Sequence, residues 1–186
     1  TFVYRIHDTP DSDRISTLNN IIKKLGYSIN NESSDKLSHS LNKLLKNIKG
    51  KGEQQMIETL TIRSMAKAIY TTNNIGHYGL AFKHYSHFTS PIRRYPDLIV
   101  HRLLDKYLCG RESVNKDVVE KICKHCSEME KLSSRAERDS IKFMQVKFLK
   151  NKIGFVYDGV ISGVTEWGLY IEITENKCEG LVKVSS

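Results

Sequence analysis

The sequence has 186 residues, of which 39% are hydrophobic, so it is long enough for one ordinary domain and a small second one. Lysine and arginine number 29 against 21 acidic residues, and the formal charge of +8 favours a polyanionic partner, although a solvated basic surface gives the same balance. Neither a membrane-spanning apolar run nor a signal-peptide layout is present, so we expect a soluble, cytoplasmic protein without a membrane partner.

The N-terminal part predicts a short strand and three helices. Residues 2–7 have the composition of a strand end, and Ser12 or Asp13 is placed to cap a first helix with apolar residues at helical spacing. A second helix follows a polar stretch and ends at Gly50. A third is predicted over residues 53–70. We interpret these helices as scaffold.

The middle of the chain contains an irregular segment between helices. From residue 73 to residue 97 no hydrophobic period holds, and glycine, histidine, tyrosine, serine, proline and arginine are concentrated there. Pro96 is well placed as an early helical residue, so a helix should follow and end at Gly110. A long helix is then predicted over residues 114–150.

The hydrophobic period changes to two after the long helix, which marks a domain boundary near Asn151. The predicted fold class is therefore α+β. A mainly helical unit covers residues 1–150, and a β unit covers residues 151–186. We expect the β unit to contain about three strands within this sequence.

Four cysteines are sparse for this length and indicate a reducing compartment, so we expect no disulfide-linked partner. Cys123 and Cys126 form a CxxC pair. Neither a second pair nor a ligand-spaced histidine pair follows to complete a zinc tetrahedron. We predict no metal site within these residues.

The irregular segment offers hydrogen-bond donors and aromatic rings that a nucleic acid could use. Arg93 and Arg94 lie beside a helix start, where unpaired N–H groups and the helix dipole favour an anion. A guanidinium there can bind a phosphate through two parallel hydrogen bonds. Alternatively, Thr89 or Ser90 caps a turn. In that case Arg93 or Arg94 pairs with Asp97, and the residues alone leave both possibilities open.

The histidines of the segment are less informative. His84 and His87 are three residues apart, but this spacing in a loop is weak evidence for metal ligation, and imidazole suits zinc better than Mg²⁺. We interpret both as structural hydrogen-bonding residues. The same interpretation applies to His77, His101 and His125.

The long helix contains a carboxylate within its apolar arc. Residues at helical spacing form this arc: Val119, Ile122, Cys126, Met129, Leu132, Ala136, Met144 and Phe148. Glu137 falls inside it, and an inward-facing carboxylate needs a partner. Either a salt bridge or a backbone cap satisfies Glu137, or the carboxylate serves an active site.

The run HFTSPIRRYPDLIVHRLL at residues 87–104, with HYGLA before it, closely resembles the signature of the RNB catalytic domain of RNase II/RNase R exoribonucleases. The resemblance implies that Arg93 reaches the scissile phosphate and stabilises charge that develops on it. Residues 135–139 resemble the RAERD-like segment of the family, which implies a place near the 3′-terminal nucleotide for Glu137. We predict that Arg93 and Glu137 are catalytic. We also predict that Arg94, Tyr95 and His87 contact RNA.

Residues 152–186 resemble the first three strands of a five-stranded OB barrel, in particular the RNA-binding barrel named after ribosomal protein S-one that follows the RNB domain. Such barrels bind single strands by stacking aromatic rings on bases while lysines hold the backbone. The predicted RNA-binding residues here are Phe155, Trp167, Tyr170 and Lys183. We expect at least one of the three aromatic residues to lie in the core instead.

The resemblance implies a processive 3′→5′ exoribonuclease that uses Mg²⁺ to hydrolyse single-stranded RNA to nucleoside 5′-monophosphates. The family's Mg²⁺-binding aspartates lie in an earlier motif that nothing in this chain resembles, and Asp8, Asp11 and Asp13 fit helix initiation better. We therefore expect a fragment that is inactive alone, with most metal ligands outside it. One alternative is a non-catalytic RNA-binding or scaffold protein with an RNB shape. Another, a helical DNA-binding protein, explains the charge but not the motif.

Overall fold

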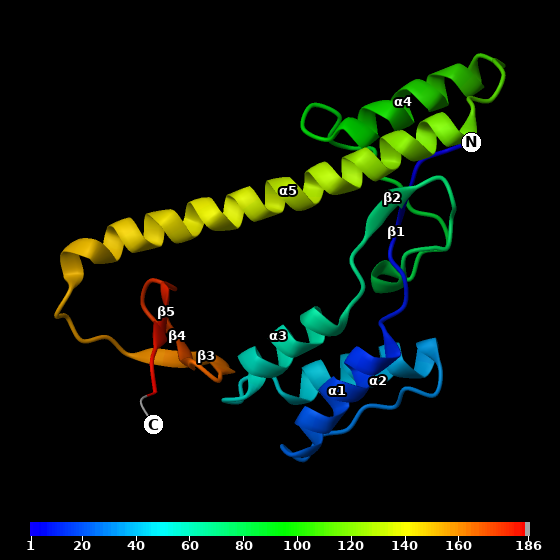
Figure 1. Cartoon of the computed structure of the whole chain (residues 1–186). Coiled ribbons are helices and arrows are strands. Elements are labelled where there is room, and N and C mark those ends of the chain that lie inside the picture. The colour runs from blue at the N-terminus through cyan, green and yellow to red at the C-terminus, as the bar shows by residue number, and fades with distance from the viewer. Residues whose placement is uncertain (185–186) are drawn as a thin grey trace. The chain divides into compact units, whose positions relative to one another are not determined.

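The computed structural model describes residues 1–184, which form two compact units, Thr1–Glu128 and the residues from Met129 onward (Figure 1). Helix α5 (Lys116–Leu149) begins in the first unit and continues into the second. The helices are accompanied by two small antiparallel sheets, which confirms the α+β prediction. The domain boundary near Asn151 stays a prediction. No helix among the described residues is long and apolar enough to cross a membrane.

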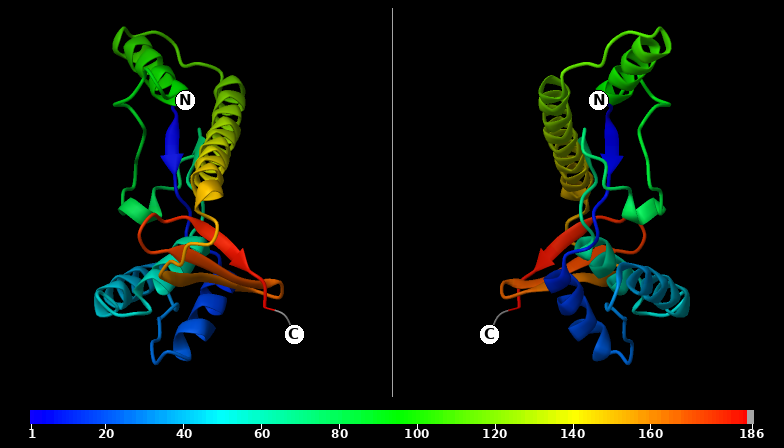
Figure 2. Two further views of the ribbon diagram at one scale, coloured as in Figure 1. Left: turned by 90° about the vertical axis from the view of Figure 1, so that its left-hand side faces the viewer. Right: turned by 90° about the vertical axis from the view of Figure 1, so that its right-hand side faces the viewer.

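Helices α1 (Ser12–Lys23), α2 (Ser34–Asn47) and α3 (Gln54–Ser64) pack together in the first unit (Figure 2). Each contributes the apolar side chains that recur at helical spacing. Their shared core contains Ile15, Leu18, Ile22, Ile29, Leu37, Leu41, Leu44, Ile48 and Ile57. This packing accounts for the scaffold role predicted for the three helices.

Two details of these helices differ from the prediction. Asp11, rather than Ser12 or Asp13, caps α1, because its Oδ1 accepts hydrogen bonds from the N–H groups of Asp13 and Arg14 at 2.9 and 3.2 Å. Helix α3 ends at Ser64, so residues 65–70 are not helical.

The end of the predicted third helix is instead strand β2 (Ile69–Thr71), which pairs antiparallel with β1 (Tyr4–Ile6). Tyr70 lies opposite Arg5, and the Tyr70 N–H donates to the hydroxyl of Ser127 at 2.9 Å. Partners distant in the sequence therefore decide the conformation here, as tertiary contacts often override local propensity.

Helix α4 (Tyr95–Leu108) and the start of α5 form a second core with this small sheet. Its buried members are Val3, Tyr70, Ile99, Val100, Leu103, Val119, Cys123 and Cys126. The segment from β2 to α4 contains only the short 3-10 helix η1 (Tyr78–Leu80). As predicted, Pro96 lies in the first turn of α4.

The second unit continues from α5 through the short 3-10 helix η2 (Lys150–Lys152) into a three-stranded antiparallel sheet. Strands β3 (Gly159–Thr165), β4 (Gly168–Ile173) and β5 (Glu179–Val182) are neighbours in that order. These strands do not close into a barrel within the described chain. Residues 185–186 of the predicted barrel segment lie outside the described residues.

Candidate nucleic-acid interface

The turn before α4 is fixed by a buried carboxylate. Asp97, in the first turn of the helix, has 0% of its surface exposed. Its Oδ2 accepts a hydrogen bond from the backbone N–H of Ser90 at 2.8 Å and another from Nη2 of Arg94 at 2.9 Å. The Arg94 N–H donates to the Ser90 carbonyl at 3.0 Å and closes the turn. The structure thus selects Arg94 as the partner of Asp97.

Arg93, the neighbouring residue, has the opposite environment. Its side chain is exposed and makes no hydrogen bond or ion pair with any other described residue. Ile92 before it and Tyr95 two residues after it are also exposed. The turn therefore presents one free guanidinium beside the start of a helix, where an anion is favoured.

Arg94 lies in a more enclosed environment than Arg93, and the RNA contact predicted for it stays a prediction. Only 22% of its side chain is exposed, and its Nη2 is held by Asp97. Its Nε is buried without a partner among the described residues. Arg94 therefore supports the turn from inside, where its guanidinium compensates a buried carboxylate.

The histidines around the turn are structural, as interpreted from the sequence. A hydrogen bond of 2.7 Å joins His87 Nδ1 to the hydroxyl of Tyr70, and the two rings meet edge to face. His101 donates from Nε2 to the carbonyl of Phe88 at 2.8 Å, and their rings stack with centroids 4.2 Å apart. His87 was also predicted to bind RNA, and its contact with Tyr70 does not favour that role.

A second histidine pair organises the loop around η1. His7 donates from Nε2 to the Ala66 carbonyl at 2.8 Å, and its Nδ1 accepts from the Gly79 N–H at 3.0 Å. The His77 ring stacks on the His7 ring with centroids 5.0 Å apart. Burial lowers the pKa of His77, and the neighbouring His7 and Arg5 side chains lower it further.

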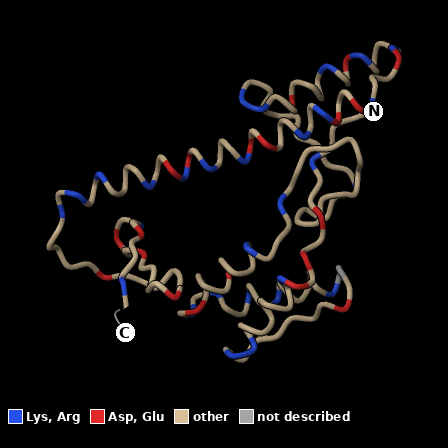
Figure 3. The backbone as a smooth tube through the Cα atoms, in the orientation of Figure 1, with Lys and Arg blue, Asp and Glu red and all other residues tan. Residues whose placement is uncertain are grey.

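Glu137 is not buried, so the prediction of an inward-facing carboxylate is wrong for this chain. Every side chain over residues 131–144 is exposed, and charges of both signs alternate along α5 (Figure 3). The apolar arc is buried only at its N-terminal end, where Val119 and Cys126 join the second core. An apolar arc becomes buried only where another element covers it, and none covers Leu132 or Met144 among the described residues.

The predicted stacking residues of the second unit are all exposed. Phe155 and Trp167 have 69% and 71% of their surfaces exposed, and Tyr170 on β4 has 37%. The expectation that at least one of them lies in a core is wrong, because three strands do not enclose one. Lys183 is exposed directly after β5. All four residues are therefore accessible to a ligand.

The described residues do not provide a metal centre. No group of three or more histidine, cysteine, aspartate or glutamate residues within 1–184 is arranged to hold a metal ion. Cys123 and Cys126 are buried in the second core as free thiols. Burial raises the pKa of Cys123 to about 12, and the charge of Glu120 adds to this effect.

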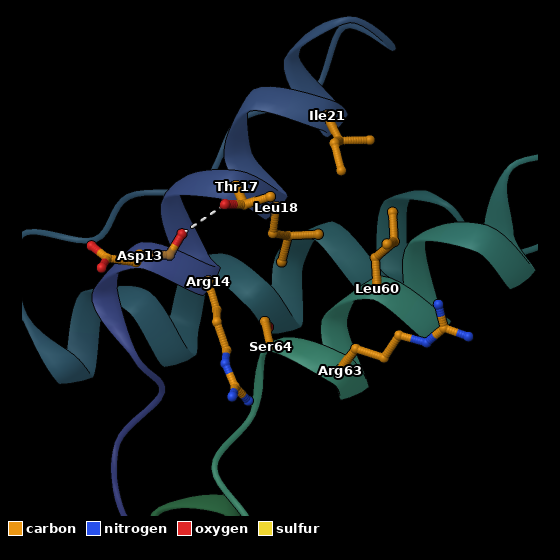
Figure 4. A pocket seen from close by; sticks show the side chains of 8 residues that line it. All are labelled: Asp13, Arg14, Thr17, Leu18, Ile21, Leu60, Arg63 and Ser64. Atoms are coloured by element: carbon orange, nitrogen blue, oxygen red, sulfur yellow. Dashed lines mark hydrogen bonds between the residues drawn. The ribbon is translucent and has the colours of Figure 1, made fainter. Parts of the chain in front are cut away.

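A pocket of about 360 Å³ lies between α1 and α3 (Figure 4). Leu18 and Leu60 line it, and Arg14 and Arg63 extend along its edge. Both arginines are exposed, and long side chains of this kind commonly cover apolar surface between helices. We therefore assign no ligand to this pocket.

Comparison with known proteins establishes the family. Residues 1–110, more than half of the chain, match the model of the RNB domain. This chain belongs to the RNB family. The matched range includes the Ser90–Asp97 turn, so the sequence resemblance is confirmed where its motif lies.

Curated relatives of this RNB chain are named Ribonuclease R. That of Aquifex aeolicus is 39% identical over 99% of the chain and 26% of the relative. That of Thermotoga maritima is 42% identical over 100% of the chain and 27% of the relative. The RNB chain thus spans about a quarter of the length of these relatives.

Solved structures have the same fold. Mycoplasma genitalium RNase R in complex with ribose-methylated single-stranded RNA superimposes with a TM-score of 0.87 at 29% identity, over 98% of this chain and 30% of that one. Yeast Ssd1, a pseudonuclease, superimposes with a TM-score of 0.76 at 22% identity, over 97% of this chain and 23% of that one. The second likeness concerns the fold alone, so the fold by itself does not establish catalysis.

Proposed function

We propose that this chain is the later part of the catalytic domain, and the start of the RNA-binding barrel, of a longer 3′→5′ exoribonuclease that releases nucleoside 5′-monophosphates. The observation that carries the proposal is the free guanidinium of Arg93 on a turn held by buried Asp97. The similarity of this chain to relatives named Ribonuclease R also supports the proposal.

In this proposal, Arg93 binds the scissile phosphate. A guanidinium binds phosphate oxygens through two parallel hydrogen bonds, and its charge stabilises the negative charge that grows during displacement. Glu137 is assigned a place near the 3′-terminal nucleotide. Its carboxylate is exposed and therefore accessible to RNA.

The proposed activity uses Mg²⁺, but the described residues do not form a site for this ion. Mg²⁺ requires an octahedral set of oxygen ligands, whereas residues 1–184 contain no group arranged to hold a metal. We propose that its ligands lie in other parts of the longer protein. The 186-residue chain alone should therefore bind RNA without hydrolysing it.

In this proposal, the second unit binds single-stranded RNA. Trp167, Phe155 and Tyr170 offer exposed rings to successive bases, and Lys183 offers a charge to the backbone. Stacking of this kind tolerates any base, because every base has a flat π face. Binding should therefore depend little on RNA sequence.

The decisive experiment compares Arg93→Ala with Arg102→Ala in the full-length protein. Arg102 is an exposed arginine on the following helix and serves as the matched control. We expect Arg93→Ala to lower kcat on a 3′-labelled single strand by on the order of a hundredfold or more, with a much smaller loss of RNA affinity. Equal losses of turnover and affinity would defeat the assignment of Arg93.

Two further outcomes separate the alternatives. If the wild-type full-length protein binds RNA but releases no mononucleotides with Mg²⁺, it is a non-catalytic member with the RNB fold. If the purified 186-residue chain releases mononucleotides, the proposal that its metal ligands lie elsewhere is wrong.

A further inference from the structure

We propose that Asp97 is a positioning residue, which holds the turn that presents Arg93 by binding Arg94 and the Ser90 N–H together. The inference rests on the proposed function of Arg93 and adds the reason why one of two adjacent arginines is free. Arg94 then acts as the internal counter-charge of Asp97 rather than as a contact for RNA.

The carboxylate of Asp97 is buried beneath the turn. Asp97 is 0% exposed, although an acidic residue can favour a helix N-terminus equally well from the surface. Burying a carboxylate is costly unless it is paired and hydrogen-bonded, and the Ser90 N–H and Arg94 Nη2 both donate to Oδ2. The same charge could stabilise the helix without burial, so the burial itself needs another explanation.

The turn that contains Arg93 is held at both ends. The turn begins at Ser90 and ends at Arg94, and the Arg94 N–H donates a hydrogen bond to the Ser90 carbonyl at 3.0 Å. Both residues also donate a hydrogen bond to Asp97. Between them, Pro91 has a restricted φ and leaves few backbone conformations. Arg93 therefore lies within a turn whose two ends are held, while its own side chain stays exposed.

The Asp97–Arg94 pair leaves one buried atom of each side chain unsatisfied within residues 1–184. Asp97 Oδ1 and Arg94 Nε are buried and have no partner among the described residues. Removing the carboxylate would leave a largely buried guanidinium uncompensated, and the turn would open to hydrate it. The displaced turn would move Arg93 as well.

The test is a double-mutant cycle in the full-length protein. Asp97→Asn keeps the shape of the side chain and removes its charge, and Asp105→Asn on the exposed side of the same helix is the control. We expect Asp97→Asn to lower kcat by on the order of a hundredfold with little change in RNA affinity, because a small misplacement of a catalytic group has an effect of that size. The control should retain wild-type kcat.

The cycle separates positioning from general destabilisation. Because Asp97 acts through Arg93, adding Asp97→Asn to Arg93→Ala should slow the enzyme no further. Additive losses, or wild-type turnover in Asp97→Asn, would overturn the inference and leave the role of Arg93 intact. Full turnover in Arg93→Ala would overturn the proposed function and this inference with it.

A second variant covers the case in which Asp97→Asn does not fold. Arg94→Met combined with Asp97→Asn removes both charges together, so no unpaired charge stays buried, and such replacements of buried ion pairs are often tolerated. This variant should melt near the wild-type temperature and still lose turnover to a similar extent. A folded variant with wild-type kcat would overturn the inference.

Discussion

Glu120 and Thr72 are joined by two hydrogen bonds, in which Oε2 of Glu120 accepts from the N–H and from the hydroxyl of Thr72, both at 2.7 Å. The hydroxyl of Thr71 adds contacts of 3.0 Å to both carboxylate oxygens. Glu120 lies near the start of α5, so these bonds fix the point at which the chain leaves β2 for the loop that leads to Arg93. No sequence pattern pairs these residues.

Replacing Glu120 by Gln should make stability less dependent on pH in acid. Burial raises the pKa of Glu120, but the hydrogen bonds from Thr72 and Thr71, with the charge of Lys124, outweigh it and place the pKa below its ordinary 4.5. The carboxylate therefore contributes stability that is present above pH 4.5 and is lost as the pH falls through the lower folded pKa.

At pH 7 we expect Glu120→Gln to reduce the free energy of unfolding by about 1.5–3 kcal/mol, the usual range for hydrogen bonds to a charged group. Urea denaturation at neutral and acidic pH measures this, with exposed Glu112→Gln as the control. The difference from wild type should shrink in acid. A difference that is the same at both pH values would contradict the linkage.

His77 should make the protein less stable below neutral pH. Burial, together with the neighbouring His7 and Arg5 side chains, holds its pKa below 6.5, so the unfolded chain takes up a proton more readily than the folded one. The stability that comes from neutral His77 is thus present above pH 6.5 and is lost as the pH falls towards the folded pKa. His77→Gln should lose less stability between pH 7.5 and 5.5 than exposed His39→Gln does. Identical pH profiles of the two variants would refute this.

The three-helix core should depend on Ile57 and not on Ile62 of the same helix. Ile57 is 0% exposed and Ile62 is 72% exposed. Ile57→Ala should lower the free energy of unfolding by about 2–5 kcal/mol, through lost burial and the cavity left behind. Ile62→Ala should change it by less than about 0.5 kcal/mol. Comparable urea midpoints for the two variants would show that this core is packed differently.

Trp167 should contribute to RNA binding without sequence preference. Replacing it by Ala removes an exposed ring, and the loss of one stacked base corresponds to about 1–3 kcal/mol of binding free energy. Fluorescence anisotropy with two single strands of different sequence should show the same loss for both. Val164→Ala, at an exposed position on β3, is the control and should bind like wild type. Unchanged affinity in Trp167→Ala would remove this ring from the RNA-binding surface.

The sequence by itself determined the features that depend on neighbouring residues. Helical spacing predicted α1, α2 and α5, Pro96 predicted the start of α4, and the change of hydrophobic period predicted the sheet after α5. The motif that includes Arg93 identified the family. Backbone propensities and side-chain periods act over a few residues, so a short stretch of sequence is enough to reveal them.

The tertiary structure decided which residues meet. Tyr70 became part of a strand because β1 and Ser127 pair with it, and Glu137 is exposed because no described element covers that part of α5. Arg93 and Arg94 are chemically identical neighbours, and only the burial of Asp97 determines that one is paired and the other free. Pairing of a buried charge depends on distance and desolvation in three dimensions, which adjacent positions in a sequence do not encode.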